Sequence, residues 1–488
     1  MGRTEGMSAA WTRRSLLLHA VATGASVLGC HVPRRASHTA PHPATSPDVG
    51  PTDARGPDAG VTSRYEVIVL GAGIAGLRAA ECLRDAGLRA CVIEARDRIG
   101  GRIESVRLGD ARVDLGASHI ENAPYSAVAA RLRGIRANLL PSDSSLLLLN
   151  ESRRSLSRAR RAVWKQRFDD ACARALRSLA EGHDCSAAEG MAAWFQSMSA
   201  HSAEARGAHW HQRMHVELTR SVLMDRLSLR ALRSDHEPYA MAMQVQGGLA
   251  TLTESMATGL EVLTQHVVRA IMCAHDGVRI ESSHGILQAK ALVCTVPIGV
   301  LRAGHIRFEP ALEPSRMEAI SRIEPGARAV QVASYAERSW RMREQFASAI
   351  EPRPDVPDVT PWLEDLSHWT GTPTLRAQWH SSWLTSVALA ERSEEATRAM
   401  GQVLSISDRP RERPFRDWSV DPFALGARSA LGVGGTLGDR ERLAQPFENK
   451  VFFAGEATSM SAEGSLDAAY ASGQRAADEV LAHVRRAG

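Results

Sequence analysis

The sequence predicts an α/β protein with two domains, a Rossmann-type nucleotide-binding domain and a second, α+β domain. Three observations lead to this prediction. The chain has 488 residues, a length that usually divides into about two or three domains. An apolar strand at 65–70 runs into a glycine-rich turn and then a helix, which is the order of a Rossmann unit. Further strand and glycine motifs occur in 246–300 and 421–488, separated by long stretches of different character.

The composition is that of a globular protein with little net charge. Hydrophobic residues make up 44% and charged residues 23%, and 59 basic side chains face 55 acidic ones. The basic stretch 153–161 has one aromatic residue near it, Trp164. We interpret this stretch as a solvated helix face and expect no nucleic-acid partner. The seven cysteines lack metal-ligand spacing, so we expect no metal site.

Residues 1–30 resemble an export signal. Arg13 and Arg14 precede an apolar run that reaches Gly29, which is too short to span a membrane but typical of a signal peptide. The arginine pair resembles a twin-arginine signal, and residues 27–30 resemble a lipoprotein cleavage box that ends in Cys30. The resemblance implies export to the bacterial cell envelope and a lipid on Cys30, which would anchor the protein to a membrane, facing the periplasm or the surface.

Residues 31–63 are predicted to be a disordered linker. Six prolines alternate with small and polar residues, and no aromatic residue appears. Such a segment cannot bury a core. As a coil it would span roughly 30 Å, which is enough to hold a globular part away from a membrane.

The glycine motif after the first strand has the spacing of a dinucleotide-binding turn. It reads Gly71-Ala72-Gly73-Ile74-Ala75-Gly76. We expect Gly71 to allow the tight turn, Gly73 to let the backbone approach a pyrophosphate at the start of helix 77–85, and Gly76 to let helix and strand pack closely. The next strand, 89–93, ends in Glu94. Its carboxylate would accept hydrogen bonds from ribose hydroxyls and repel a 2′-phosphate.

The residues that follow indicate which dinucleotide binds. The segment Ala95-Arg96-Asp97-Arg98-Ile99-Gly100-Gly101-Arg102 offers glycine backbone and positive charge to phosphate, and Asp114-Leu115-Gly116-Ala117 follows it. These motifs resemble those of the flavin-containing amine oxidase family, which includes monoamine, polyamine and L-amino-acid oxidases. The resemblance implies an FAD cofactor, a Rossmann-type FAD-binding domain and an α+β substrate-binding domain.

The resemblance covers the chain from Tyr65 to its last residues. Segments 246–249, 267–271, 293–301, 418–422, 452–458 and 464–469 come in the family's order. It implies that Val268 touches the adenine and that the N–H of Leu466, at a helix start, faces the flavin ring. The cofactor-binding residues that motif and resemblance imply are Gly71, Gly73, Ala75, Gly76, Glu94, Ala95, Arg96, Gly101, Arg102, Gly116, Ala117, Ser118, Val268, Trp418, Gly455, Glu456, Ser465 and Leu466.

The motifs also set the expected domain boundaries. The FAD-binding domain takes residues 64–124, 246–300 and 421–488, and the substrate domain takes 125–245 and 301–420. Residues 125–245 have helical patterning. Their tryptophans and methionines could line a substrate tunnel, but the helical spacing favours a core. His211 and His215 have the spacing of metal ligands, yet we interpret them as surface or core histidines, because the flavin supplies the chemistry.

Several positions depart from the family's pattern. Ala427 stands where a covalent flavin needs a cysteine, so we expect noncovalent FAD. Arg428 and Ser465 stand where monoamine oxidases form an aromatic cage, so no cage of two tyrosines can form. Arg328 is the basic residue nearest to the position of the lysine that holds a water near flavin N5. Because arginine does not release a proton, the enzyme could be a dehydrogenase rather than an oxidase.

Three residues are candidates for contact with the substrate. The stretch 118–122 resembles the one in which some polyamine oxidases place a substrate-facing glutamate. Glu121 would then hold a distal ammonium group, or it is a surface acid in a turn. Arg328 or Arg428 could instead bind a substrate carboxylate through two hydrogen bonds. His119 replaces a common tryptophan, and we interpret it as a packing variant.

These residues predict an FAD-dependent oxidoreductase acting on a small-molecule amine. Hydride would pass from the carbon beside a neutral amine to flavin N5, water would hydrolyse the imine, and O₂ or another acceptor would reoxidise the flavin. One alternative is an L-amino-acid oxidase or dehydrogenase. Others are a desaturase of carbon–carbon bonds in lipophilic substrates and a flavin-binding lipoprotein without activity. An apolar tunnel would favour the desaturase, and acids near the flavin would favour an amine.

Overall fold

The structure is a computed structural model that describes most of the chain after residue 63. The described residues are 64–142, 145–150, 154–179, 183–199, 202–233, 241–349, 361–461 and 463–487. The expected signal peptide, Cys30 and the linker 31–63 lie outside them. The described residues belong to one compact unit.

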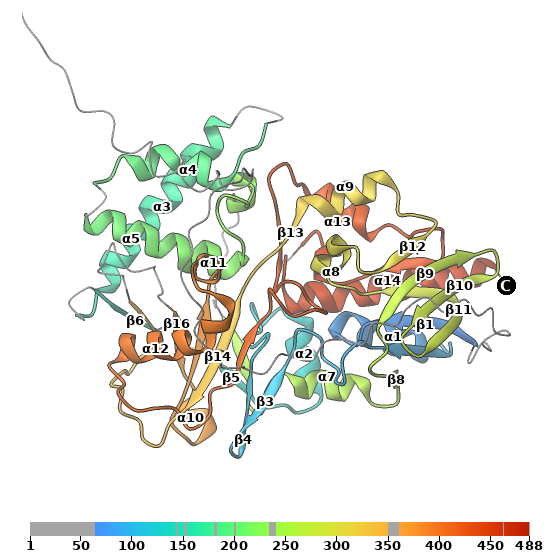
Figure 1. Ribbon diagram of the computed structural model, residues 1–488, viewed down its shortest axis with the longest axis horizontal. Helices are drawn as coiled ribbons and strands as arrows, with labels where there is room; N and C mark the ends of the chain where they lie inside the picture. Colours follow the sequence, from blue (N-terminus) through green and yellow to red (C-terminus); the bar gives the residue numbers. More distant parts are fainter. Residues whose placement is uncertain are drawn as a thin grey trace, which may run out of the picture. The chain divides into compact units, whose positions relative to one another are not determined.

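The larger of two main sheets is built around β1 (Figure 1). Its order is β12-β9-β10-β11-β1-β2-β8, and β20 also pairs with β11. Five strands of this sheet are mutually parallel, namely β8, β2, β1, β11 and β20. Strand β10 is antiparallel to both of its neighbours, β9 and β11. Their bounds are β1 Arg64–Leu70, β2 Ala90–Ile93, β8 Glu261–Leu263, β9 Val268–Ala274, β10 Gly277–Ser282, β11 Gly285–Cys294, β12 Arg307–Glu309 and β20 Val451–Phe453.

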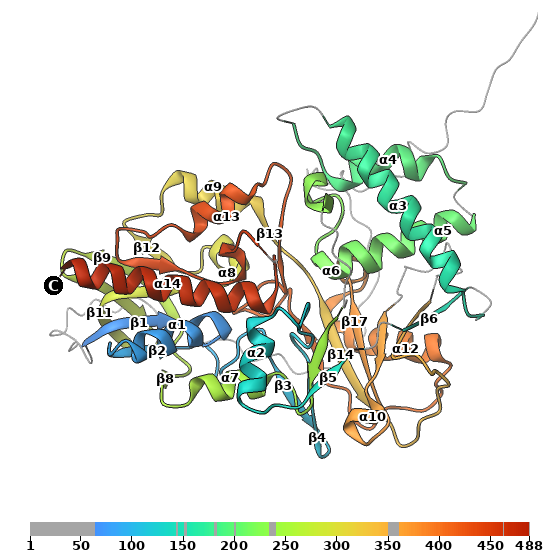
Figure 2. The same ribbon diagram turned by 180° about the vertical axis from the view of Figure 1, so that it is seen from behind.

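Helices cover one face of this sheet. Helix α1 (Ile74–Asp85) and the long α14 (Leu466–Ala487) lie side by side (Figure 2). A Cβ atom added to Gly473 of α14 would lie 2.1 Å from the carbonyl oxygen of Ala75, so only glycine permits this approach. Helices α2 (Ala127–Gly134) and α7 (Ala250–Ala257) contribute to the same hydrophobic core. Side chains of β9 and β10 pack with the opposite face of β1 and β11.

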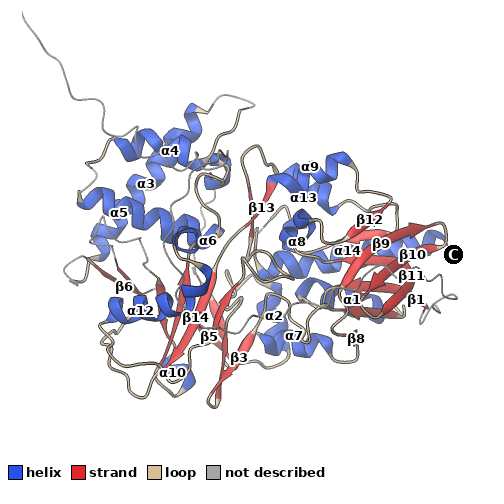
Figure 3. Ribbon diagram, in the orientation of Figure 1, coloured by secondary structure: helices blue, strands red, loops and turns tan. Residues whose placement is uncertain are grey.

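A second, mostly antiparallel sheet has its own core (Figure 3). Its order is β18-β14-β17-β16-β15-β6, and only the β15–β6 pair is parallel. Helix α12 (Arg392–Leu404) packs on it. The bounds are β6 Leu146–Leu149, β14 Ala329–Ser334, β15 Phe346–Ala349, β16 Trp362–Asp365, β17 Thr374–Trp379 and β18 Phe415–Asp417.

A helical layer carries the tryptophans and methionines noted in the sequence. It consists of α3 (Arg158–Ser178), α4 (Ala187–Gln196), α5 (Ala203–His211), the π-helix η1 (Gln212–Glu217) and α6 (Leu218–Arg220). Trp164, Trp210, Met191 and Met214 are buried in its cores. They therefore pack the helices together, as their spacing favours, and none of them lines the large cavity described below.

Two segments lie elsewhere than the sequence suggested. Residues 125–245 are not wholly part of the substrate domain, since α2 packs in the core under β1, and β5 (Leu139–Pro141) pairs with β7 (Met243–Val245) beside it. The first-domain sheet also continues past residue 300, because β12 pairs with β9. Beyond it, α9 (Pro314–Arg322) shares a core with α8 (Ile298–Ala303). The short elements α2, β5 and β12 carry none of the motifs, so the sequence alone does not show which sheet or core they join.

A buried ionic cluster joins β7 to the second sheet. Glu364 on β16 and Arg376 on β17 form a salt bridge whose side chains are 1% and 2% exposed, with Arg376 Nε 3.1 Å from Glu364 Oε2. Gln244 on β7 donates to Glu364 and accepts from Arg376, and Gln345 donates to Glu364 at 2.9 Å. Every oxygen of the buried carboxylate is thus satisfied, which a buried charge requires.

The described residues contain neither a membrane-spanning helix nor a metal-binding cluster. No helix there has both the length and the apolar character needed to cross a membrane. No set of three or more His, Cys, Asp or Glu side chains in the same residues is arranged to hold a metal ion. Of the two histidines with ligand-like spacing, His211 is buried and its ring contacts Phe168.

The substitution Glu364→Gln should destabilise the protein by about 3–5 kcal/mol, because it leaves the Arg376 charge buried without a counter-ion. Burial alone would raise the pKa of Glu364, but the charge of Arg376 is the largest of the opposing effects, which together lower that pKa to about 2. A depressed carboxyl pKa stabilises the folded state fully above the ordinary value of 4.5, and this contribution is lost as the pH falls towards 2. The difference in unfolding free energy between wild type and E364Q should therefore shrink over that range.

Denaturant unfolding at several pH values measures this difference. The matched control is Glu394→Gln, which removes a carboxylate from an exposed pair with Arg413 and should change stability little. Equal stability of E364Q and wild type at neutral pH would contradict the assigned role of the buried pair.

Candidate active site

One cavity of about 650 Å³ collects almost all of the residues that the sequence singled out. Its size lies within the range of roughly 300–1,000 Å³ that is typical of ligand sites. Among the residues expected to bind the cofactor, Gly76 does not line the cavity. The lining residues among those predicted are Gly71, Gly73, Ala75, Glu94, Ala95, Arg96, Gly101, Arg102, Gly116, Ala117, Ser118, Glu121, Val268, Arg328, Trp418, Arg428, Gly455, Glu456, Ser465 and Leu466.

The glycine turn brings the start of α1 to the cavity wall. Gly71 has φ +104°, and a Cβ there would lie 2.4 Å from Thr295 Oγ1. That hydroxyl donates to the carbonyl of Leu70 at 2.8 Å. A Cβ on Gly76 would lie 1.9 Å from the carbonyl oxygen of Gly71. The start of helix α1 is therefore in close contact with the end of β1. The helix begins at Ile74, three residues earlier than the sequence suggested, and Gly73 is its N-cap.

Gly73 leaves the first turn of α1 open to the cavity. It provides no side-chain cap to the helix, and a Cβ placed on it would meet nothing within 4 Å. Helix N-termini carry unsatisfied N–H groups and a partial positive charge, so they bind anions. The Gly73 wall is therefore suited to a pyrophosphate.

Backbone amides hold Glu94 in place at the end of β2. Its carboxylate accepts from the N–H of Ala72 at 2.8 Å and from the N–H of Arg96 at 3.0 Å. Arg96 in turn pairs with Asp421 at 2.5 Å. The glycine turn, β2 and the third segment of the domain are fastened together at this point, with Glu94 on the cavity wall.

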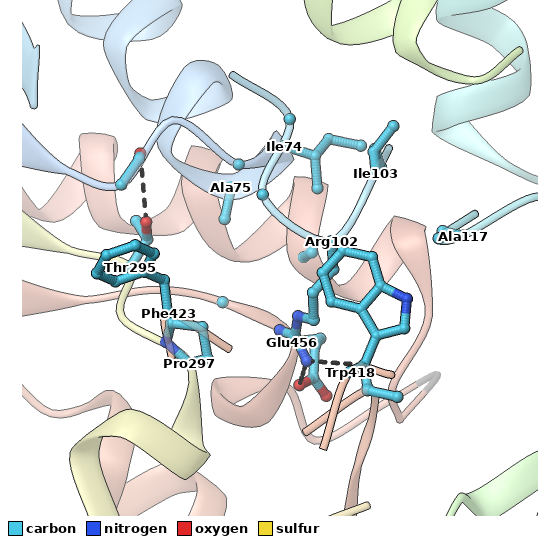
Figure 4. A pocket seen from close by; sticks show the side chains of 18 of the residues that line it. Ile74, Ala75, Arg102, Ile103, Ala117, Thr295, Pro297, Trp418, Phe423 and Glu456 are labelled. Atoms are coloured by element: carbon cyan, nitrogen blue, oxygen red, sulfur yellow. Dashed lines mark hydrogen bonds and ion pairs between the residues drawn. The ribbon is translucent and has the colours of Figure 1, made fainter. Parts of the chain in front are cut away.

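Arg102 and Glu456 meet on the wall of the cavity (Figure 4). Their closest atoms are 2.9 Å apart, and Arg102 also donates to the carbonyl of Ala427 at 2.9 Å. Burial alone would raise the pKa of Glu456, but Arg102 and Arg440 outweigh it, and the pKa lies below its usual value. Trp418 lies beside this pair and donates to the carbonyl of Leu115 at 2.9 Å.

The two substrate candidates Glu121 and Arg428 bind each other. Arg428 Nη2 lies 3.0 Å from Glu121 Oε1. Its other nitrogens donate to the carbonyls of Gly464 at 2.9 Å and Thr219 at 3.0 Å. The sequence treated the carboxylate as a site for an ammonium and the guanidinium as a site for a carboxylate. The structure joins them into one largely neutral pair on the cavity wall.

Arg328 is the third candidate, and it precedes β14. It donates to the carbonyl of Leu218 and lies 3.3 Å from the side-chain oxygen of Gln378. Its guanidinium is therefore held between the end of the π-helix and β17, while the residue lines the cavity.

Ser465 has a structural role that the sequence did not suggest. Its hydroxyl accepts from the N–H of Ala468 at 3.0 Å, as an N-cap does. Helix α14 then begins at Leu466, so its first turn faces the cavity together with that of α1.

Sequence reasoning missed several residues of the wall. Gln378 belongs to a strand with every residue buried, and Thr219 follows the π-helix, so neither stands in a recognisable motif. Thr295 lies within the recognised segment 293–301, and Phe423 directly follows the segment 418–422. These positions are the signal that could have found them. His119 lines the cavity as well.

Comparisons with known proteins agree with this geometry. Residues 74–481 match the family model described as flavin containing amine oxidoreductase. The chain is 29% identical over 448 residues to Lysine-specific histone demethylase 1 homolog 2 of Oryza sativa subsp. japonica, covering 87% of this chain but 58% of that protein. It is 27% identical over 441 residues to Polyamine oxidase 2 of Arabidopsis thaliana, covering 86% of this chain and 88% of that protein. It is 25% identical over 433 residues to Polyamine oxidase 4 of Oryza sativa subsp. japonica, covering 85% of this chain and 88% of that protein.

The cavity fits FAD, the cofactor of this family. Gly73 and Gly455 leave space where a Cβ would meet nothing within 4 Å, and the uncapped N-terminus of α1 and Arg102 are suited to phosphate. Glu94 stands where ribose hydroxyls would be bound. No described residue of the cavity wall is a cysteine, in keeping with FAD that is bound noncovalently.

The substitution Arg102→Ala should weaken FAD binding roughly 10- to 100-fold, the loss expected for one hydrogen bond to a charged group. Titration of apoprotein with FAD, followed by flavin fluorescence, measures the change. Arg112→Ala is the matched control, because that guanidinium pairs with Glu254 and does not line the cavity. Equal affinities for R102A and R112A would contradict the phosphate-binding role.

Proposed function

Because the chain belongs to the family of flavin-containing amine oxidoreductases, we propose that it oxidises the C–N bond of a primary or secondary amine to an imine. FAD, when bound, accepts the hydride from the carbon beside the amine nitrogen. The protein binds and orients the substrate at the cavity wall and excludes water. The imine is then hydrolysed.

The observation that carries this proposal is the polar part of the cavity wall. Glu121, Arg428, Arg328 and His119 line the same cavity as the dinucleotide motif. A lipophilic substrate would take water away from these polar and charged groups without offering them a hydrogen bond, at a cost in free energy. The wall therefore supports an amine in preference to the desaturation of carbon–carbon bonds.

The amine to test first is a polyamine. Two of the similar proteins are polyamine oxidases, and the chain spans 88% of each, whereas it spans little more than half of the demethylase homolog. The resemblance implies that Glu121 holds a distal ammonium group of the substrate. In the structure Arg428 already donates to this carboxylate, so the ammonium group would have to compete with Arg428.

A second candidate substrate is an amino acid. Arg328 and Arg428 place two guanidinium groups on the wall, and Glu121 is paired with Arg428. A guanidinium binds a substrate carboxylate through two hydrogen bonds, so these side chains favour a substrate that carries a carboxylate.

We further propose that an acceptor other than O₂ reoxidises the flavin. Arg328 lies near the position where the family resemblance expects a lysine that holds a water. Its guanidinium is bound to Leu218 and Gln378, and it does not release a proton.

Anaerobic mixing of the holoenzyme with substrate tests the proposal. We expect spermine or spermidine, or else an L-amino acid, to bleach the absorbance of oxidised FAD. Bleaching by polyamines alone supports a role for Glu121, and bleaching by amino acids alone supports Arg328 or Arg428. Admission of air then measures reaction with O₂, which we expect to be slow. Failure of every amine and amino acid to reduce the flavin would overturn the proposed reaction.

We also propose that residues 1–30 direct export by the twin-arginine route and that Cys30 carries a lipid. The support is the arginine pair followed by the cysteine box in the sequence. Mass spectrometry of the mature N-terminus should show an acylated Cys30, and Cys30→Ala should release the protein from membranes. An unmodified Met1 or an unmodified Cys30 on the mature protein would contradict the proposal.

A further inference from the structure

The orientation of the Gln244 side chain is fixed by the charges around it. Its nitrogen donates to Glu364 Oε1, and its oxygen accepts from Arg376 Nη2 at 3.0 Å. The reverse orientation would place an oxygen against a carboxylate and an NH₂ group against a guanidinium, which has no acceptor. The Gln244 nitrogen is therefore a donor on the side that faces His119.

This donor sets the tautomer of His119. Nε2 of His119 lies 2.7 Å from the Gln244 nitrogen and 3.5 Å from Glu364 Oε1. Two nitrogens 2.7 Å apart form a hydrogen bond only if one of them has a lone pair that accepts. The NH₂ group of Gln244 can only donate. His119 Nε2 is thus the acceptor, and the ring hydrogen sits on Nδ1. Burial, which outweighs the opposing effect of Glu364, lowers the pKa of His119 and keeps the ring neutral.

The tautomer in turn decides what Ser118 can do. His119 Nδ1 lies 3.0 Å from Ser118 Oγ. Because Nδ1 carries the hydrogen, the hydroxyl oxygen is the acceptor, and its own hydrogen points elsewhere. Ser118 lines the cavity and is 7% exposed. The hydrogen bonds found among the described residues include no acceptor for that hydrogen.

We propose that Ser118 donates a hydrogen bond into the cavity, to an acceptor atom of FAD or of the substrate, and that His119 is the positioning residue that fixes this direction. The chain of bonds runs from the Arg376–Glu364 salt bridge through Gln244 and His119 to the hydroxyl. A packing variant would need none of these polar partners.

The two possible acceptors have different consequences. A donor to the flavin ring stabilises the reduced, anionic ring more than the oxidised one, since hydrogen bonds to charged groups are stronger. It would raise the reduction potential. A donor to the substrate leaves that potential unchanged and lowers KM. Only the second case rests on the proposed amine or amino-acid substrate.

Four variants of the full-length holoenzyme test the proposal. Ser118→Ala removes the hydroxyl, and Ser118→Thr keeps it. In His119→Asn the amide nitrogen can take the place of Nδ1, whereas in His119→Gln the longer side chain carries the amide to the position of Nε2. The last two are both amides and differ mainly in reach. Ser178→Ala, at the end of α3 and outside the cavity, is the control.

The first readout needs no substrate. If FAD holds the acceptor, S118A and H119Q should lower the midpoint potential of FAD and shift its absorption band, while S118T, H119N and S178A should retain wild-type values. If the substrate holds the acceptor, S118A and H119Q should instead raise KM about tenfold, the effect of one hydrogen bond, with the potential unchanged.

Two results would overturn the proposal. One is an S118A enzyme whose potential, spectrum and KM all equal those of wild type. The other is an equal shift in H119N and H119Q, which indicates a packing role for the ring. If no amine or amino acid reduces the flavin, the proposed reaction fails, but the potential and the spectrum still decide whether Ser118 donates its hydrogen bond to the flavin ring.

Discussion

The whole site depends on backbones that approach more closely than any Cβ atom allows. Gly76 lies against the carbonyl of Gly71, and Gly473 of α14 lies against the carbonyl of Ala75. A third contact of this kind brings Gly299 against the carbonyl of Leu425. These contacts bind β1, α1 and α14 into one unit and point the starts of both helices at a single cavity. The first turns of α1 and α14 then place their N–H groups and the positive ends of two helix dipoles at the cavity. This arrangement favours an anionic cofactor.

Charge around the cavity is organised in pairs. Arg102 faces Glu456, Arg428 faces Glu121, and Arg376 faces Glu364. The first two pairs join segments that are far apart in the sequence, whereas Arg376 and Glu364 lie on the neighbouring strands β17 and β16. Buried pairs of this kind contribute little net stability, but the loss of one partner is costly. A ligand group that binds one of the charged side chains on the wall therefore has to compete with the partner that this side chain already has.

The sequence predicted those parts of the site that are local in the chain. A glycine turn, a strand that ends in Glu94 and a helix that starts at Leu466 each depend on neighbouring residues, and motif spacing reveals them. The pairing of Glu121 with Arg428 could not be predicted, because it joins residues 307 positions apart. His119 was interpreted as a packing variant for the same reason, since Gln244, Glu364 and Arg376 lie on strands with no functional motif. Short elements such as α2 and β12 carry no motif, so their place beside the first sheet could not be predicted from the sequence.

The order of segments along the chain has a consequence for biosynthesis. The cavity wall takes residues from β1, from the segment around β9 and β11, and from the start of α14. A nascent chain that has not yet exposed α14 lacks one side of the pocket and the partner of the α1 surface. FAD binding therefore requires that α14 has been synthesised, and a bound flavin indicates that the polypeptide has been made through α14. Products truncated before α14 would lack flavin and would leave the apolar surface of α1 exposed. Exposed apolar surface is what proteases and chaperones recognise.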